Sequence, residues 1–201
     1  MAITAQQVQA LRGKTGAGIM DCKRALEEAN GDVEQAVTVL RKQGAARADA
    51  RLSRATTEGV IASYIHAGGK IGVLVEVNCE TDFVARTGEF QELARNLAMH
   101  VAAEQPRFLR QDDVPEDVVD KEREVYRALA IKEGRPEKVL DRIVEGRLKK
   151  FYSEVCLLDQ PYVRDDQQTV GEVIKEAMAQ LGENIVVRRF MRYQLGDEGR
   201  S

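Results

Sequence analysis

The sequence contains no tryptophan, and only two histidines and three cysteines among its 201 residues. Histidine is a common metal ligand and general base, and the isolated His66 and His100 form no cluster for either role. Cys22, Cys79 and Cys156 have neither the even number of a disulfide framework nor the paired spacing of a zinc site. We therefore expect no metal, no cofactor and no redox centre, and we expect Cys22 and Cys79 to pack as small apolar side chains.

Long hydrophobic runs are also missing, since no stretch approaches the length that spans a bilayer. The first residues, Met1–Thr4, carry neither an apolar run nor a basic leader, so we expect no membrane association and a cytoplasmic location. The glycine-containing segment Thr15–Gly18 lacks the preceding strand and the following Lys-Ser or Lys-Thr pair of a phosphate-binding loop. We therefore expect no direct nucleotide binding. Without a nucleophile or acid–base arrangement, we do not expect an enzyme.

The composition describes an ordinary folded domain, with 43% hydrophobic and 31% charged residues. The formal net charge of −3 argues against nucleic acid as the main partner, because phosphate affinity depends on Lys and Arg. A local basic string, Arg188-Arg189 with Arg192, is interpreted as a solvated strand face. The length suffices for one sizeable core and a smaller accessory domain.

Three short amphipathic helices are predicted within residues 1–45. A capping-box pattern at Thr4 opens the first helix, and a glycine-rich turn at residues 13–18 leads into the second. Asn30 and the glycine after it stop the second helix, and Gly44 is predicted to end the third. Such short helices in so short a segment predict a compact bundle.

The next segments predict a β-hairpin followed by a long helix. Residues 71–77 alternate apolar and other side chains with the period of two that is typical of a half-buried strand, and 59–65 form its partner strand. Apolar residues then recur at helical spacing from Phe90 to Val101. The chain therefore passes from strand to helix near residues 78–86.

This strand-to-helix turn carries the strongest candidate site. Thr81 and Asp82 are good helix-capping residues, which places Phe83 at a helix start. Phe83 lies seven residues before Phe90, so one continuous helix would bury both aromatic side chains. However, Gly88 interrupts the helical run, and a separate first turn would project Phe83 outward with Asp82 as a wedge for a partner protein. From the residues alone both interpretations stay open.

The second half of the chain predicts two long helices joined by Gly134-Arg135-Pro136, which must fold back as an antiparallel hairpin over about residues 115–158. An amphipathic helix near 170–181 and a strand at 184–195 follow. The fold class is therefore α+β, with a small antiparallel sheet packed on helices and a protruding helical hairpin. We divide the chain into a three-helix domain at 1–45, an exposed, partly helical linker at 46–58, and a core domain at 59–201.

Several strings in ordered positions strongly resemble the bacterial elongation factor Ts family. They are Leu11-Arg12, Thr15–Lys23, Thr81–Arg86 and Glu145–Lys150. The resemblance implies a guanine-nucleotide exchange factor that binds elongation factor Tu with GDP. It also implies that the N-terminal bundle has the ubiquitin-associated-like fold and docks on the partner GTPase. The chain has a single core unit, as the short forms of the family do.

The resemblance also assigns roles to residues. It implies that Thr81, Asp82, Phe83 and Val84 form a wedge that disturbs the partner's Mg²⁺ and phosphate site. For partner docking the resemblance favours Met20 and its neighbours Arg12 and Lys23. We add Ile19, which follows the same glycine turn, and His66, for which a partner contact is expected more than for His100. For Ile19 and Met20, a core role in so small a bundle stays open as the alternative.

Parts of the chain also suggest two other functions. The hairpin-plus-helix core suggests an RNA-binding module, although it lacks aromatic residues at alternate strand positions for base stacking. The bundle alone suggests a ubiquitin-type adaptor, which leaves the rest of the chain without a role. Since longer family members carry two core units, a homodimer would restore the second copy, with the exposed part of the last strand as its interface. No cysteine lies near Met191 in that strand, so the dimer is expected to be noncovalent there.

Overall fold

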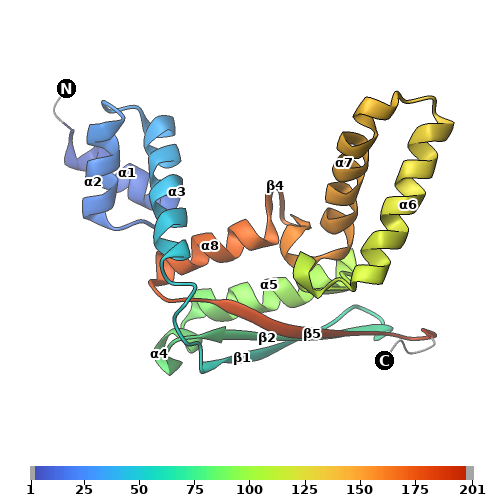
Figure 1. Cartoon of the computed structure of the whole chain (residues 1–201). Helices are drawn as coiled ribbons and strands as arrows, with labels where there is room; N and C mark the ends of the chain where they lie inside the picture. Colours follow the sequence, from blue (N-terminus) through green and yellow to red (C-terminus); the bar gives the residue numbers. More distant parts are fainter. Residues whose placement is uncertain (1–2, 198–201) are drawn as a thin grey trace. The chain divides into compact units, whose positions relative to one another are not determined.

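The computed structural model describes residues 3–197 and divides into two compact units. The first unit contains the chain up to Val60 together with residues 77–93 and 172–186. The second contains residues 61–76, 94–171 and the chain from Val187 onward. Helices and two antiparallel sheets make up both units, which confirms the predicted α+β class (Figure 1).

The first unit begins with the three helices α1 (Ala5–Thr15), α2 (Ile19–Glu28) and α3 (Val33–Asp49) (Figure 1). The predicted capping box opens α1, because the Thr4 hydroxyl accepts a hydrogen bond from the Gln7 backbone N–H at 3.2 Å. The bundle's buried core consists of small and medium apolar side chains: Val8, Leu11, Cys22, Ala25, Leu26, Ala29 and Ala36. The predicted N-terminal bundle is therefore confirmed.

The predicted end of the third helix at Gly44 is wrong, because α3 continues to Asp49. A glycine inside a helix costs about 1 kcal/mol relative to alanine, which is why the sequence suggested an end there. In the structure Gly44 lies against α8 (Val170–Leu181), and a Cβ atom built on Gly44 would lie only 3.2 Å from the Cβ of Ala179. The glycine therefore permits close helix packing within the first unit.

A three-stranded sheet follows the bundle, with the strand order β1-β2-β5. The strands are β1 (Glu58–Ile65), β2 (Ile71–Cys79) and β5 (Val186–Gln194), and α5 (Gly88–Glu104) lies along one face of the sheet (Figure 1). As predicted, β2 alternates, and the side chains that it buries are Val73, Val75, Val77 and Cys79. The central strand thus anchors the sheet to its helical layer.

The last strand, β5, runs antiparallel to β2. The Leu195 N–H donates to the Lys70 carbonyl at 2.8 Å, and the Arg189 guanidinium contacts the Glu76 carboxylate at 2.7 Å. As the residue number rises on one strand it falls on the other, which defines an antiparallel pair. Among the described residues β5 stands at the end of the strand order β1-β2-β5, which makes it an edge strand there.

The second unit contains the predicted helical hairpin, formed by α6 (Glu116–Lys132) and α7 (Glu137–Val155) (Figure 1). Gly134 adopts a φ of 72° at the joint, a left-handed conformation that glycine adopts without a steric penalty. An ion pair between Arg147 and Glu133 joins the helices at 2.7 Å. The hairpin is therefore confirmed.

A short two-stranded ribbon was not predicted. It pairs β3 (Pro161–Tyr162) with β4 (Asp165–Thr169) in antiparallel fashion. The β4 residues are acidic, amide or hydroxyl side chains, so they carry no apolar alternation that would indicate a strand. A parallel bridge between Phe108 and Cys156 also joins the segment after α5 to the end of α7.

His100 lies fully buried on α5, inside a hydrogen-bond network of the second unit. Its Nδ1 accepts from the Val163 N–H at 3.2 Å, so its Nε2 carries the proton and donates to the Gln160 Oε1 at 3.0 Å. The Gln160 amide in turn donates to the carbonyls of Glu104 and Glu154. The neutral imidazole thus links α5, the end of α7 and β3. Burial lowers the pKa of His100, although the Gln160 hydrogen bond opposes the shift.

The buried His100 predicts a pH-dependent stability. Its folded-state pKa lies below its unfolded value of about 6.5, so the unfolded chain binds more protons below that pH. The free energy of unfolding should therefore fall as the pH is lowered through about 6.5. Urea unfolding at about pH 7.5 and at about pH 5, on either side of the range in which histidine titrates, measures the slope.

The matched variants are His100→Gln and His66→Gln, which each remove one of the two histidines. We expect the first to flatten the pH dependence near pH 6.5 more than the second, which serves as the comparison. Identical slopes in all three proteins would contradict the assignment to His100.

Among residues 3–197, no helix combines the length and the apolar character needed to cross a bilayer. The three cysteines are buried and unpaired, which confirms the prediction that Cys22 and Cys79 pack inside the protein. Burial raises the pKa of both Cys79 and Cys156 to about 11, so these thiols stay protonated at neutral pH.

Candidate partner-binding site

The turn after β2 forms a four-residue helix, α4 (Asp82–Ala85), in the first unit (Figure 1). Thr81 caps it as predicted, because its hydroxyl accepts a hydrogen bond from the Val84 N–H at 3.4 Å. Val84 and Ala85 are buried, whereas the Phe83 side chain is 77% exposed. The short helix therefore uses one side for anchoring and presents an aromatic ring on the other.

The interpretation of Phe83 as a core residue is wrong, because the chain breaks between α4 and α5. The Thr87 hydroxyl donates to the Val84 carbonyl at 2.8 Å and accepts from the Phe90 N–H at 3.3 Å. It thereby closes one helix and caps the next. Phe90 is fully buried, so the break places these two aromatic side chains in opposite environments. The glycine that suggested this interruption begins α5.

Asp82 lies next to Phe83 and is also exposed. Its carboxylate pairs with the Arg86 guanidinium at 2.9 Å, one helical turn further on. Both side chains are largely in water, so the pair contributes little to stability. The carboxylate therefore stays available for contacts outside the chain.

The turn that carries α4 is held by Glu183, which precedes β5 in the first unit. One carboxylate oxygen of Glu183 accepts from the backbone N–H groups of Glu80 and Thr81, each at 3.0 Å. Its other oxygen accepts from the Thr81 hydroxyl at 2.6 Å. Three donors on one carboxylate, all from the same turn, fix the direction in which the chain enters α4.

Asn184 extends this arrangement to the segment after α3. Its backbone N–H donates to the Glu80 carboxylate at 2.6 Å, and its buried side-chain amide donates to the carbonyls of Leu52 and Arg54 at 3.3 and 2.8 Å. Arg54 also lies 3.4 Å from the Glu80 carboxylate. Sequence reasoning missed these residues, because the partners are more than a hundred positions apart and no local pattern marks them.

The end of the strand before the turn is anchored by Cys79. Its buried thiol donates to the Thr81 carbonyl at 3.2 Å. Gly59 on β1 allows a close approach nearby, since a Cβ atom there would lie 2.2 Å from the Val77 carbonyl oxygen. Packing and hydrogen bonds thus restrain the backbone on both sides of Thr81.

The bundle presents a second exposed surface at the start of α2. Ile19 and Met20 are 55% and 64% exposed, so the alternative that places them in the core is wrong. Lys23 lies one turn further along the same helix face and pairs with Glu27 at 3.8 Å. Arg12 is exposed in the last turn of α1. Two large apolar side chains in water beside cations are typical of a protein-binding surface.

The start of α2 is fixed to α3 by Asp21. Its carboxylate accepts two hydrogen bonds from Arg47, at 2.8 and 2.9 Å, and also pairs with Arg24. The Arg47 hydrogen bonds, opposed by partial burial, lower the pKa of Asp21 to about 2. Asp21 therefore stays ionised at neutral pH and holds the helix that carries Ile19 and Met20.

His66 belongs to the second unit, unlike the other predicted site residues. It is exposed at the end of β1, where its Nδ1 lies 3.1 Å from the Tyr64 hydroxyl. The structure therefore carries Thr81 to Val84 on one turn of the first unit and the four bundle residues on α1 and α2 of the same unit, whereas His66 belongs to the second unit. Within residues 3–197, no group of three His, Cys, Asp or Glu side chains is arranged to hold a metal ion.

Comparison with known proteins identifies the family. The family model for elongation factor TS matches residues 23–197. Elongation factor Ts of Carboxydothermus hydrogenoformans is 55% identical over 97% of this chain and 90% of its own length. The Moorella thermoacetica protein of the same name is 56% identical over 97% of this chain and 96% of its own length, and that of Geobacter sulfurreducens is 54% identical over 98% and 91%. These matches give no support to the RNA-binding alternative, and the chain belongs to the elongation factor Ts family.

Proposed function

We propose that this chain releases GDP from elongation factor Tu by inserting Phe83 into the partner's nucleotide domain, where it disturbs the Mg²⁺ and phosphate site. The observation that carries the proposal is an aromatic side chain, 77% exposed, on a turn whose backbone is held by Glu183. Thr81, Asp82 and Val84 complete the wedge as cap, exposed carboxylate and buried anchor.

Family membership assigns the general role. Proteins of the elongation factor Ts family are guanine-nucleotide exchange factors for elongation factor Tu, and this chain has that role in translation elongation. An exchange factor makes and breaks no covalent bond. It accelerates release because it binds the nucleotide-free partner more tightly than the GDP-bound one. By reciprocity, GDP must weaken the partner's affinity for this chain by the same factor.

The anchoring of α4 explains how a four-residue helix can displace groups that hold the nucleotide in the partner. A side chain that must be ordered on binding loses entropy, whereas one on a pre-organised turn loses less. Val84 and Ala85 are buried, and Glu183 restrains the turn, so only the ring of Phe83 has to find its site. More of the binding energy is then available to displace groups that hold the nucleotide.

The bundle supplies a second contact in this proposal. Ile19 and Met20 dock on the partner as apolar anchors, and the exposed side chains of Lys23 and Arg12 supply polar contacts from the same bundle. Methionine suits such a surface because its flexible side chain adapts to the partner's shape. His66 is a further exposed contact. The chain acts in the cytoplasm and itself binds no nucleotide, nucleic acid or membrane.

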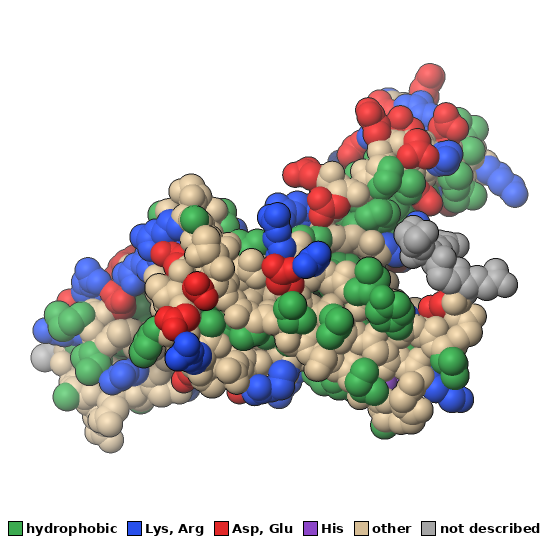
Figure 2. All heavy atoms as spheres, turned by 90° about the horizontal axis from the view of Figure 1, so that it is seen from below, with side chains coloured by type: hydrophobic (Ala, Val, Ile, Leu, Met, Phe, Trp, Pro, Cys, Tyr) green, Lys and Arg blue, Asp and Glu red, His purple; other side chains and the backbone are tan. Residues whose placement is uncertain are grey.

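The chain also forms a noncovalent homodimer in this proposal, through the second unit's sheet. Arg189 contacts Glu76, so Met191 and Tyr193, which follow it at intervals of two residues, share a face with Leu74. Figure 2 shows hydrophobic side chains over the face of the molecule seen from below. The large apolar side chains exposed on these strands include Ile61, Ile65, Leu74, Met191 and Tyr193. Burying them against a second copy removes apolar area from water.

The wedge predicts that Phe83→Ala reduces exchange without affecting the fold. The release rate of fluorescent GDP from elongation factor Tu should fall by at least about tenfold, the loss of an interface anchor of about 1.4 kcal/mol. The free energy of unfolding should change by less than about 0.5 kcal/mol, because the ring is exposed. The control Val125→Ala removes another exposed side chain, on α6, and should leave exchange unchanged. An unaltered rate with Phe83→Ala rejects the wedge.

The Glu183 contacts predict a positioning role. Glu183→Ala removes the acceptor of three hydrogen bonds, so the maximal rate of GDP release should fall by about tenfold. The concentration giving half of that rate should change little, since the bundle surface is untouched. Glu183→Gln keeps one acceptor oxygen and should retain an intermediate rate. The control Glu176→Gln removes a carboxylate of α8 that pairs with Arg41, and it should leave the maximal rate of GDP release unchanged. A lower affinity with an unchanged maximal rate would contradict the positioning role.

The proposed dimer is tested by light scattering of the purified chain over a range of concentrations. We expect the mass of two copies at high concentration. Met191→Glu, which places a charge in the apolar face, should shift the mass to that of one copy. The control Leu129→Glu introduces the same charge at an exposed position of α6 and should leave the measured mass at that of two copies. A single-copy mass for the unchanged chain at all concentrations rejects the dimer.

A further inference from the structure

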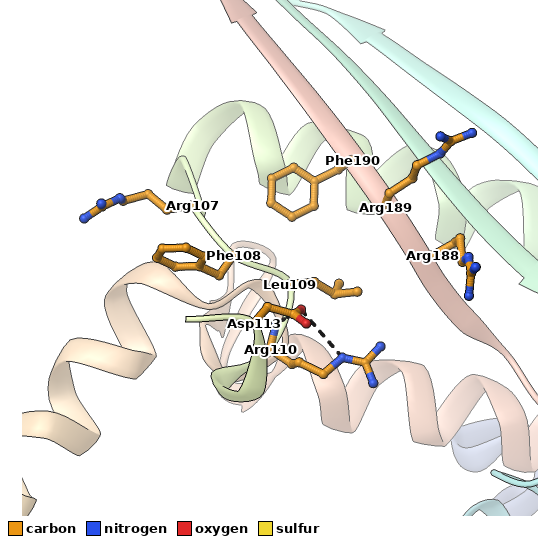
Figure 3. Close-up of a pocket in the computed structure, with 8 residues that line it drawn as sticks. All are labelled: Arg107, Phe108, Leu109, Arg110, Asp113, Arg188, Arg189 and Phe190. Carbon is orange, nitrogen blue, oxygen red and sulfur yellow. Dashed lines mark hydrogen bonds and ion pairs between the residues drawn. The ribbon is translucent and has the colours of Figure 1, made fainter. Parts of the chain in front are cut away.

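A pocket of about 380 Å³ in the second unit is lined by four arginines, one aspartate and three apolar side chains (Figure 3). One wall comes from the segment after α5, residues 107–113, and the other from β5, residues 188–190. These two stretches are about eighty positions apart, so the sequence showed only an isolated basic string in β5. The tertiary structure adds Arg107 and Arg110 to it.

Two of the four arginines are neutralised within the chain. Arg189 pairs with Glu76 at 2.7 Å, and Arg110 lies 3.7 Å from the Asp113 carboxylate. Arg107 and Arg188 are exposed, and within residues 3–197 neither has an ion-pair partner. The pocket therefore keeps two uncompensated positive charges, one on each wall.

The charges are arranged around an apolar centre. Figure 3 shows Phe108 and Leu109 on one wall and Phe190 on the other, with Arg107 on one side of these apolar side chains and Arg188 on the opposite side. Phe108 and Phe190 are only half-buried. The Arg107 guanidinium lies over the Phe108 ring at 5.4 Å, a cation–π contact that orders it. The apolar side chains of the pocket therefore lie between the positive charge of Arg107 and that of Arg188.

We propose that this pocket binds an acidic segment of a partner protein, in which an apolar side chain is flanked by carboxylates. Planar guanidinium groups form paired hydrogen bonds with carboxylates, and a half-buried aromatic floor accepts the apolar side chain between them. Arginine and aromatic side chains in a concave site are also the residues that carry most binding energy at protein interfaces. The proposal concerns the second unit alone and does not depend on the wedge at Phe83.

A peptide fits this pocket better than RNA for electrostatic reasons. Affinity for a phosphate backbone requires a track of uncompensated cations, whereas only Arg107 and Arg188 are uncompensated here. Asp112 and Asp113 are exposed on the same segment as Arg107 and would repel successive phosphates. Arg107 also covers the ring of Phe108, which limits stacking of a base on it. Two carboxylates on a short segment match the two free charges in number, whereas a nucleic-acid backbone adds a further negative charge with every nucleotide.

The test uses the full chain and a fluorescein-labelled peptide with two glutamates on each side of one phenylalanine. Fluorescence anisotropy at low ionic strength measures its binding. The double variant Arg107→Gln with Arg188→Gln should bind the peptide at least about tenfold more weakly. The control Arg142→Gln with Lys149→Gln removes two exposed charges of α7 and should bind like the unchanged chain. Added salt should weaken binding, because the attraction is electrostatic.

Two further probes decide the ligand class. The same peptide with glutamine in place of every glutamate should not bind, and equal binding of both peptides overturns the proposal. Equal effects of the two double variants also overturn it. If a short uridine oligonucleotide binds more tightly than the peptide, and loses that binding in the Arg107→Gln, Arg188→Gln variant, the pocket is a nucleic-acid site and the proposal is rejected.

Discussion

The bonds from the Glu183 carboxylate to the turn at Glu80 and Thr81 are the interaction on which the candidate site depends. Three donors from one turn meet a single carboxylate, and hydrogen bonds to an ionised acceptor are stronger than neutral ones. They set the direction of Thr81, whose hydroxyl then caps α4. The cap starts a helix whose buried side leaves Phe83 in water. A contact between distant segments thus determines the exposure of one aromatic ring.

The N-terminal bundle also leaves apolar side chains exposed where a partner can bind. A small helical domain has few large apolar side chains with which to build a core, yet α2 begins with two of them exposed. The bundle instead packs alanine, cysteine and leucine inside, and Asp21 holds α2 to α3 through Arg47. Leaving Ile19 and Met20 in water costs stability and creates a surface that a partner can cover. The proposed docking role explains this cost.

Much of the fold was predictable, because its signals are local. Capping residues, glycine turns and apolar periodicity identified the bundle, the β-hairpin and the helical hairpin. The errors arose where tertiary packing overrode local preference: Gly44 continues α3 because α8 packs against it, and the polar β4 forms a strand beside β3. The division into domains at 1–45, 46–58 and 59–201 stays a prediction.

The sequence by itself determined the α+β class, the order of helices and strands, the family resemblance and the position of the turn at Thr81. These properties are encoded by residues within a few positions of one another, since helix caps and periodic faces need no distant partner. Only the tertiary structure decided that Phe83 is exposed, that Glu183 holds its turn, and that Arg107 and Arg188 share a pocket. Each of these depends on contacts between segments far apart in the chain, whose pairing no local pattern specifies.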